Sequence, residues 1–166
     1  ELEDFIISCE EAIQKIAVFA RGIEVVVGAP SRNAKKRGKG LFNSAYHLKD
    51  GRIEDIYHKS LLPDYDVFDE QRYFEPNRSF KVFHIKSHCF GVAICEDLWN
   101  TEQHFLYEVS PAKELKRLGA QTIINIAASP FSYEQNDHRL QVLKENAVKH
   151  DLSIAYCNHI GAQTEL

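Results

Sequence analysis

Apolar residues recur at helical spacing in two long stretches of the chain. Residues 3–21 carry one such face, which is typical of a surface helix. Its members are Cys9, Ala12, Ile13, Ile16 and Ala20. Residues 134–150 carry a second face, and the residues predicted to point inward there are Leu140, Leu143 and Ala147. A shorter helix is predicted between Ser110, an N-cap residue followed by Pro111, and Gly119, a helix stop.

Short apolar and β-branched runs predict strands. Residues 23–29 are apolar almost throughout, as in a strand covered on both faces. Residues 41–48 and 52–58 flank the dipeptide Asp50-Gly51, which is a hairpin signal. The other predicted strands are residues 80–85, 89–95, 121–127 and 152–158. Hairpins mixed with strand–helix–strand units indicate an α/β fold in which helices cover a mixed sheet.

Composition narrows the class of protein. The chain has 166 residues, 44% hydrophobic and 27% charged, with a formal net charge of -4, which is ordinary for one folded domain. The densest basic run lies in a loop predicted over residues 30–40 and lacks interleaved aromatic residues, so neither nucleic acid nor a membrane surface is an expected partner. No stretch reaches the roughly 18 to 20 apolar residues of a membrane span.

The four cysteines bear on the cellular compartment, and the absence of methionine bears on the extent of the chain. The cysteines contain no Cys-x-x-Cys pair, and three lie in apolar stretches where buried thiols are common. A reducing, cytoplasmic compartment is therefore expected. Because the chain has no Met, Glu1 is not a translation start, and we expect residues 1–166 to be the central part of a single larger domain.

Two residues at predicted strand ends are candidates for covalent chemistry. Cys95 ends the strand 89–95, and a thiol held at a strand tip could face a cleft. Attack requires the thiolate, which a nearby cation favours. Lys59 follows the strand 52–58 and could supply that charge and stabilise an oxyanion. The spacing alone leaves two alternatives open, a core cysteine and an ordinary exposed lysine.

Acidic residues crowd a long loop predicted over residues 59–78, and ordered loops of this length are usually functional. The acidic residues are Asp64, Asp66, Asp69, Glu70 and Glu75. Such a cluster could bind a divalent cation or act as an acid/base set, but it lacks the spacing and central glycine of an EF-hand loop. No Cys/His zinc spacing is present either, so no metal site is predicted.

Two segments resemble the motifs of nitrilase, or carbon–nitrogen hydrolase, domains. Residues 59–74 (KSLLPDYDVFDEQRYF) look like the lysine motif of that family, in the version found in the glutaminase domain of glutamine-dependent NAD synthetases. Residues 91–99 (GVAICEDLW) look like its cysteine motif. Residues 125–131 and 158–165 resemble the segments after the next two strands, so the resemblance runs along almost the whole chain.

The resemblance implies a nitrilase-type four-layer αββα sandwich, truncated at both ends, and a Glu–Lys–Cys catalytic set. Cys95 would attack the side-chain amide of glutamine, while Lys59 and the backbone N–H of Glu96 would stabilise the oxyanion. Glu70 matches a second family glutamate near the catalytic centre. The residues implied to line the substrate pocket are Tyr65, Phe68 and Ser129.

Two positions depart from the family pattern. The general base of the family is a Glu in a Pro-Glu segment before the first helix, and residues 1–5 do not match it, so the base is expected upstream of Glu1. Gln135 stands where relatives often carry a basic residue that holds the substrate carboxylate. Arg139 is the alternative holder of that carboxylate.

The resemblance also implies the partners. Ammonia from glutamine would pass to a separate synthetase domain that uses ATP and Mg²⁺ to amidate deamido-NAD, with no cofactor in residues 1–166. Glutamine, that domain and further copies of the chain are the expected partners. Two alternatives remain: a stand-alone amidase or carbamoylase of the same superfamily, and a non-catalytic assembly module whose exposed sheet edges pair with other copies.

Overall fold

The computed structural model describes residues 2–35, 37–101, 106–129 and 135–161, with only the backbone of Gln135. The chain divides into two compact units, Glu1–Arg78 (unit 1) and Ser79–Leu166 (unit 2). Each unit holds its own sheet, of three strands in unit 1 and four in unit 2. None of the helices among the described residues is long and apolar enough to cross a membrane.

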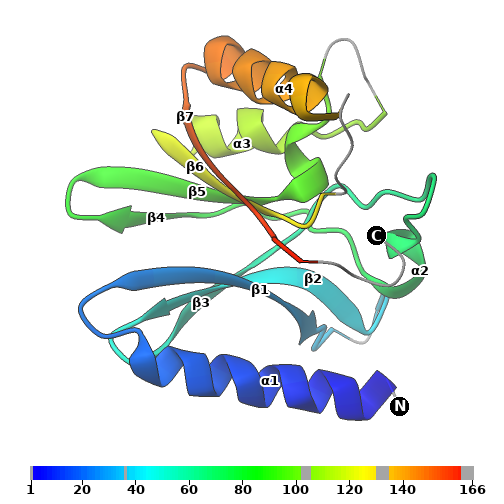
Figure 1. Cartoon of the computed structure of the whole chain (residues 1–166), viewed down its shortest axis with the longest axis vertical. Helices are drawn as coiled ribbons and strands as arrows, with labels where there is room; N and C mark the ends of the chain where they lie inside the picture. The colour runs from blue at the N-terminus through cyan, green and yellow to red at the C-terminus, as the bar shows by residue number, and fades with distance from the viewer. Residues whose placement is uncertain (1, 36, 102–105, 130–134, 162–166) are drawn as a thin grey trace. The chain divides into compact units, whose positions relative to one another are not determined.

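Unit 1 is an antiparallel sheet covered by one long helix. Its elements are α1 (Leu2–Phe19), β1 (Glu24–Arg32), β2 (Leu41–Lys49), β3 (Arg52–His58) and the short helix α2 (Glu70–Tyr73). The strands follow the order β1-β2-β3, and α1 lies along one face of this sheet (Figure 1). Ile13 and Ala17 of α1 pack with Tyr46 and Leu48 of β2 to form the core of the unit.

The hairpin predicted at Asp50-Gly51 is confirmed, since β2 pairs antiparallel with β3 across this turn. Both turn residues have positive φ, 50° for Asp50 and 83° for Gly51, as a tight two-residue hairpin turn requires. The predicted end of β1 was wrong. The strand continues through Pro30 to Arg32, because pairing with β2 extends as far as Arg32↔Leu41. Strand pairing here outweighs the local loop signal of proline.

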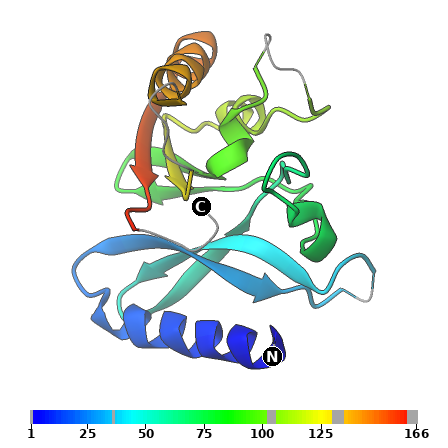
Figure 2. The same cartoon turned by 45° about the vertical axis from the view of Figure 1, so that its right-hand side comes forward.

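Unit 2 is a mixed sheet, as predicted. Its elements are β4 (Val82–Ile85), β5 (His88–Ile94), the 3-10 helix η1 (Cys95–Leu98), α3 (Pro111–Arg117), β6 (Thr122–Ala127), α4 (Gln135–His150) and β7 (Ser153–Asn158). β4 and β5 form an antiparallel hairpin, whereas β5, β6 and β7 run parallel in that order. The helices α3 and α4 connect the parallel strands and cover one face of the sheet (Figure 2).

The helix signals in unit 2 hold for α3 and fail in part for α4. Ser110 caps α3 by accepting a hydrogen bond from the Lys113 N–H at 3.5 Å, and Gly119 follows the helix with φ 95°. In α4, Leu140 was predicted to face inward but is 56% exposed. Leu143, also predicted to face inward, does pack against the core of unit 2, and Val142 and Asn146 are buried beside it.

Asn146 explains why the inward face of α4 was predicted only in part. Its amide donates to the carbonyl oxygens of Leu98 in η1, at 2.7 Å, and of Val142, at 2.9 Å. A hydrogen-bonded polar side chain can occupy a buried position without a large penalty. A search for apolar spacing therefore overlooks the face that carries Asn146, and this face ties α4 to η1.

Gly91 of β5 lies where the core leaves no room for a side chain. A Cβ built on Gly91 would lie 3.0 Å from both Cδ atoms of Leu115, a fully buried residue of α3. We predict that Gly91→Ala lowers the free energy of unfolding by about 1–3 kcal/mol through overpacking. Urea unfolding is the measurement. Gly40→Ala is the matched control, because a Cβ at Gly40 meets nothing within 4 Å; equal effects of the two changes would contradict the prediction.

Candidate active site

In unit 1, Lys59 forms a buried ion pair with Glu70. The side chain of Lys59 is 1% exposed, and its Nζ lies 2.5 Å from Glu70 Oε1. Glu70 opens α2, and its backbone N–H donates to the Pro63 carbonyl at 3.1 Å. Burial of an ammonium group is costly unless it is paired and hydrogen-bonded, which this carboxylate provides. The alternative of an ordinary exposed lysine is therefore wrong, and Lys59 is held as a single, oriented charge.

The loop between Lys59 and Glu70 brings two of the predicted pocket residues into contact. The rings of Tyr65 and Phe68 meet edge to face with centroids 5.9 Å apart, and the Phe68 N–H donates to the Tyr65 carbonyl at 3.0 Å. Tyr65 remains exposed and Phe68 half-buried. These two residues form an aromatic surface on the same loop that holds Lys59 and Glu70.

The acidic residues of this loop do not converge. Glu75 accepts a hydrogen bond from the Lys39 N–H at 2.9 Å, and Asp69 pairs with Arg72 at 3.5 Å on the surface. Within the described parts of the chain, no group of three or more His, Cys, Asp and Glu side chains is arranged to hold a metal ion. Glu70 differs from the other acids in that it faces a buried cation.

In unit 2, the chain bends sharply at Cys95. This residue follows β5, opens η1 and has φ 44°, in the left-handed region that side chains other than glycine rarely adopt. Among the residues that the structure describes, the other non-glycine residues with positive φ are Asp50, Asp66, Lys86 and Asp151. Strain of this kind costs about 1–3 kcal/mol and concentrates at functional sites. The bend is held by Asp97, a buried residue whose Oδ2 accepts from the Ile94 N–H at 3.0 Å.

The four cysteines differ in burial. Cys95 and Cys9 are half-buried, whereas Cys89 lies in the core and Cys157 is exposed. Burial raises the pKa of the Cys89 thiol, which makes it a poor nucleophile. The alternative of a core cysteine thus describes Cys89 rather than Cys95.

The ends of the parallel strands gather polar side chains around Cys95. Ser129, after β6, is linked to Asn158 at the end of β7 by two hydrogen bonds, Ser129 N–H to Asn158 Oδ1 at 2.9 Å and Asn158 Nδ2 to the Ser129 carbonyl at 3.2 Å. Arg139 Nη2 donates to Ser129 Oγ at 3.2 Å, and the Arg139 guanidinium lies 5.8 Å from the ring centroid of Tyr156. Ligands of parallel sheets bind at this end of the strands.

Tyr156 connects this cluster to Cys95. Burial raises the pKa of Tyr156; the charge of Arg139 lowers it, and that of a neighbouring Cys95 thiolate raises it further. Its hydroxyl donates to Asn158 Oδ1 at 3.3 Å. The register of β5, β6 and β7 places Cys95 at the same end of the sheet as Ser129, which contacts Arg139, the alternative holder of the substrate carboxylate. The side chain of Gln135, the predicted holder, lies outside the described residues.

Asn125 lies in the candidate site, although the sequence alone assigned no role to it. It lies in β6, is completely buried, and its Nδ2 donates to the Cys95 carbonyl at 3.5 Å. Its Oδ1 accepts no hydrogen bond from any described residue. An asparagine within the apolar run of a parallel strand is the signal that could have identified it, because a buried amide needs a partner that the strand itself does not supply.

Glu96 directly follows Cys95 and is buried. Its Oε1 accepts a hydrogen bond from the Tyr107 hydroxyl at 3.2 Å, and its carbonyl accepts from the Trp99 N–H at 2.8 Å within η1. The side chain of Glu96 thus contributes to the packing of unit 2. Its predicted role concerns only the backbone N–H.

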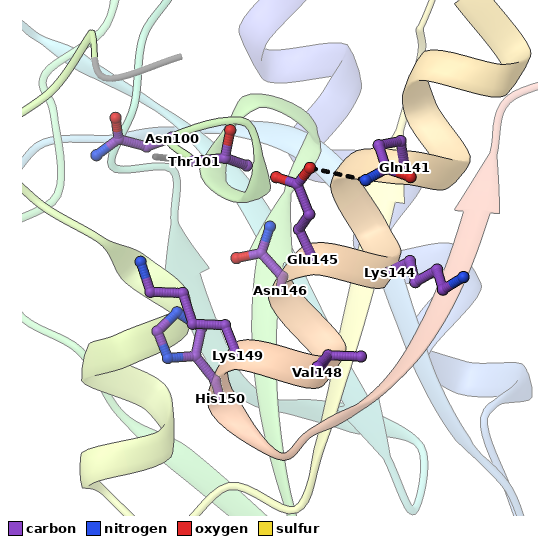
Figure 3. Close-up of a pocket in the computed structure, with 9 residues that line it drawn as sticks. All are labelled: Asn100, Thr101, Gln141, Lys144, Glu145, Asn146, Val148, Lys149 and His150. Carbon is purple, nitrogen blue, oxygen red and sulfur yellow. Dashed lines mark hydrogen bonds between the residues drawn. The ribbon is translucent and has the colours of Figure 1, made fainter. Parts of the chain in front are cut away.

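Unit 2 also has a pocket of about 490 Å³ at the C-terminal half of α4. Figure 3 shows Gln141 and Glu145 of α4, joined by a hydrogen bond of 2.9 Å, and Asn100 and Thr101 from the segment after η1. None of the predicted site residues whose side chains the structure describes lines this pocket. The pocket and the polar cluster around Cys95 are therefore separate features of unit 2.

The sequence matches a known family over almost its whole length. The profile of the family described as carbon–nitrogen hydrolase matches residues 10–166. This chain belongs to the carbon–nitrogen hydrolase family. Among curated relatives, a glutamine-dependent NAD(+) synthetase of Synechocystis sp. is 36% identical over 98% of the chain, which covers 30% of that relative.

Solved structures confirm the α/β nitrilase-type fold. A glutamine-dependent NAD+ synthetase from Acinetobacter baumannii matches 97% of the chain with a TM-score of 0.79 and 32% identity, and the chain covers 30% of that protein. A carbon–nitrogen hydrolase from Helicobacter pylori G27 has a TM-score of 0.73 over 98% of the chain at 21% identity, and the chain covers 54% of it. The chain therefore spans about a third of the NAD synthetases that it matches and half of the shorter family member.

Proposed function

We propose that residues 1–166 are part of the glutamine amidohydrolase domain of a glutamine-dependent NAD synthetase. The observation that carries this proposal is the 36% identity over 98% of the chain to a synthetase of that name. The strained bend at Cys95 and the buried Lys59–Glu70 pair support it. The intact protein is the longer polypeptide to which residues 1–166 would belong.

The proposed reaction begins with the Cys95 thiolate, which attacks the side-chain carbonyl carbon of glutamine. A C–S bond forms, the C–N bond breaks, and the nitrogen leaves as ammonia after it takes the proton that the general base had removed from the Cys95 thiol. Water then adds to the thioester, the C–S bond breaks, and glutamate leaves. The ammonium of Lys59 and the backbone N–H of Glu96 stabilise the oxyanion in both steps, in the manner of an oxyanion hole.

Substrate recognition is proposed to use the polar cluster and the aromatic surface. Arg139, which touches Ser129, supplies a positive charge suited to the α-carboxylate of glutamine. Ser129 contributes hydrogen bonds, and Tyr65 and Phe68 line the pocket. In this proposal the ammonia serves a synthetase domain that binds ATP and Mg²⁺, outside residues 1–166.

Glutamine-dependent NAD formation by the intact protein tests the proposal directly. We expect NAD to form from deamido-NAD and ATP with either glutamine or ammonium as nitrogen donor, and glutamine to be hydrolysed. A stand-alone amidase or carbamoylase would instead hydrolyse simple amides or N-carbamoyl amino acids and form no NAD. An assembly module would hydrolyse none of these, and Cys95 would not be labelled by a glutamine-like chloroketone.

The isolated 166-residue chain is predicted to be nearly inactive. Residues 1–5 do not match the Pro-Glu segment that carries the family's general base, and a general base contributes about 10²–10⁴-fold to such reactions. We therefore expect its rate of ammonia release from glutamine to be at least about a hundredfold below that of the intact protein. Coupled detection of ammonia is the measurement. Release at a comparable rate that disappears in Cys95→Ala would show that residues 1–166 contain a working base.

A further inference from the structure

We propose that Asn43 is a positioning residue for the Lys59 ammonium, acting through Glu70. Asn43 lies on β2, and its Nδ2 donates to Glu70 Oε2 at 3.0 Å. The other oxygen of the same carboxylate, Oε1, accepts from Lys59 Nζ at 2.5 Å. The inference rests on the proposed function, in which Lys59 stabilises the oxyanion.

The backbone of Lys59 is held by two hydrogen bonds that do not involve its side chain. Its N–H donates to the Asn43 carbonyl at 2.8 Å, which continues the β2–β3 pairing one residue beyond Ser44↔His58. Its carbonyl accepts from the Asn77 N–H at 2.9 Å. Because residues directly opposite each other in an antiparallel pair share a face, Asn43 and Lys59 present their side chains on the same side.

Glu70 is also held by its backbone. Its N–H donates to the Pro63 carbonyl at 3.1 Å, and its carbonyl accepts from the Phe74 N–H at 3.0 Å. What remains adjustable is the orientation of its carboxylate, at the end of a side chain that is 19% exposed. Rotation of this carboxylate would move Oε1 away from the ammonium. The hydrogen bond from Asn43 to Oε2 opposes that rotation and so fixes the position of Nζ.

An amide is suited to this role for a chemical reason. A carboxylate only accepts hydrogen bonds, so Asn43 must present its NH₂ group to Glu70. A neutral donor orients the carboxylate and leaves its full negative charge for Lys59. A second cation at position 43 would compete with Lys59 for Glu70, and a carboxylate there would repel Glu70. The contacts among Lys59, Asn43 and Glu70 thus set the position of the ammonium.

Asn43→Asp and Asn43→Ala in the intact protein test the inference. The aspartate variant would place a like charge opposite Glu70 Oε2, whereas the alanine variant only removes the donor. We expect kcat for glutamine hydrolysis to fall about ten- to a hundredfold in Asn43→Asp and less in Asn43→Ala, because a displacement of about 1 Å costs up to about 10²-fold. KM for glutamine should stay unchanged, because the role of Asn43 is to hold Glu70 and not the substrate.

The second readout does not depend on activity. Acetic anhydride should acylate Lys59 faster in both variants than in the wild type, relative to the exposed Lys15 as internal reference, as followed by mass spectrometry. Asn33→Asp is the matched control, since Asn33 donates to the Lys39 carbonyl at 2.8 Å and its hydrogen bonds join it to residues 35 and 37–40 rather than to Glu70. It should change neither kcat nor Lys59 acylation.

The outcomes separate the two proposals. A wild type without Cys95-dependent glutamine hydrolysis would overturn the proposed function, while Lys59 acylation would still report on Asn43. If the wild type is active but both Asn43 variants match Asn33→Asp in kcat and in Lys59 acylation, the positioning role is wrong. A fall in kcat that only follows the folded fraction, with Lys59 as protected as in the wild type, would reduce Asn43 to a structural residue and overturn the inference.

Discussion

Replacement of Cys95 by alanine is expected to abolish glutamine-dependent NAD formation by the intact protein and to leave ammonium-dependent formation unchanged. The reason is chemical, because the methyl group of alanine cannot form the thioester. Loss of a nucleophile typically removes several orders of magnitude of rate, so we expect glutamine hydrolysis to fall at least about a thousandfold. NAD formation with each nitrogen donor, measured on the same preparation, is the test.

The substitution should leave the fold intact. Alanine has a Cβ, as cysteine has, so the cost of φ 44° at position 95 is retained and the bend into η1 is held by Asp97 as before. Cys157→Ala is the matched control, since it removes an exposed thiol at the end of β7. Persistence of glutamine-dependent activity in Cys95→Ala, or its equal loss in Cys157→Ala, would remove Cys95 from the mechanism.

Much of the fold could be predicted because the decisive signals are local. The Asp50-Gly51 turn, the Ser110 cap and the Gly119 stop each act within a few residues, and each is found where the sequence indicated. The errors arose where distant partners decide. β1 extends through Pro30 because β2 pairs with it. The inward face of α4 includes Asn146 because η1 offers a carbonyl.

In the candidate site, too, the sequence indicated the residues but not the long-range contacts between them. The resemblance indicated Lys59 and Cys95, but spacing could not reveal that the lysine is buried against Glu70 or that the cysteine has a positive φ. These properties depend on contacts among residues far apart in the chain. The link between Ser129 and Asn158 exists only because β6 and β7 are parallel and end together. No local sequence pattern indicates which strand ends lie next to each other.

Replacement of Lys59 by methionine is expected to produce the second largest loss. Methionine has a similar length and fits a buried position, but it lacks the charge that stabilises the oxyanion. Removal of one such donor costs about 10²–10³-fold in kcat. We expect a loss of about a thousandfold in glutamine hydrolysis, again with ammonium-dependent NAD formation unchanged. Lys15→Met, on the exposed face of α1, is the control and should be neutral.

Stability and chemistry can be separated at this position by a second substitution. Lys59→Met alone leaves the Glu70 carboxylate largely buried without its cation, which should lower the free energy of unfolding by about 3 kcal/mol. Lys59→Met with Glu70→Gln removes both charges, so we expect it to recover most of that stability and none of the activity. If activity returned with stability, Lys59 would serve only to hold the loop between β3 and α2. If instead the double variant is stable and inactive while Glu70→Gln alone keeps more activity, the buried ammonium acts on the reaction itself.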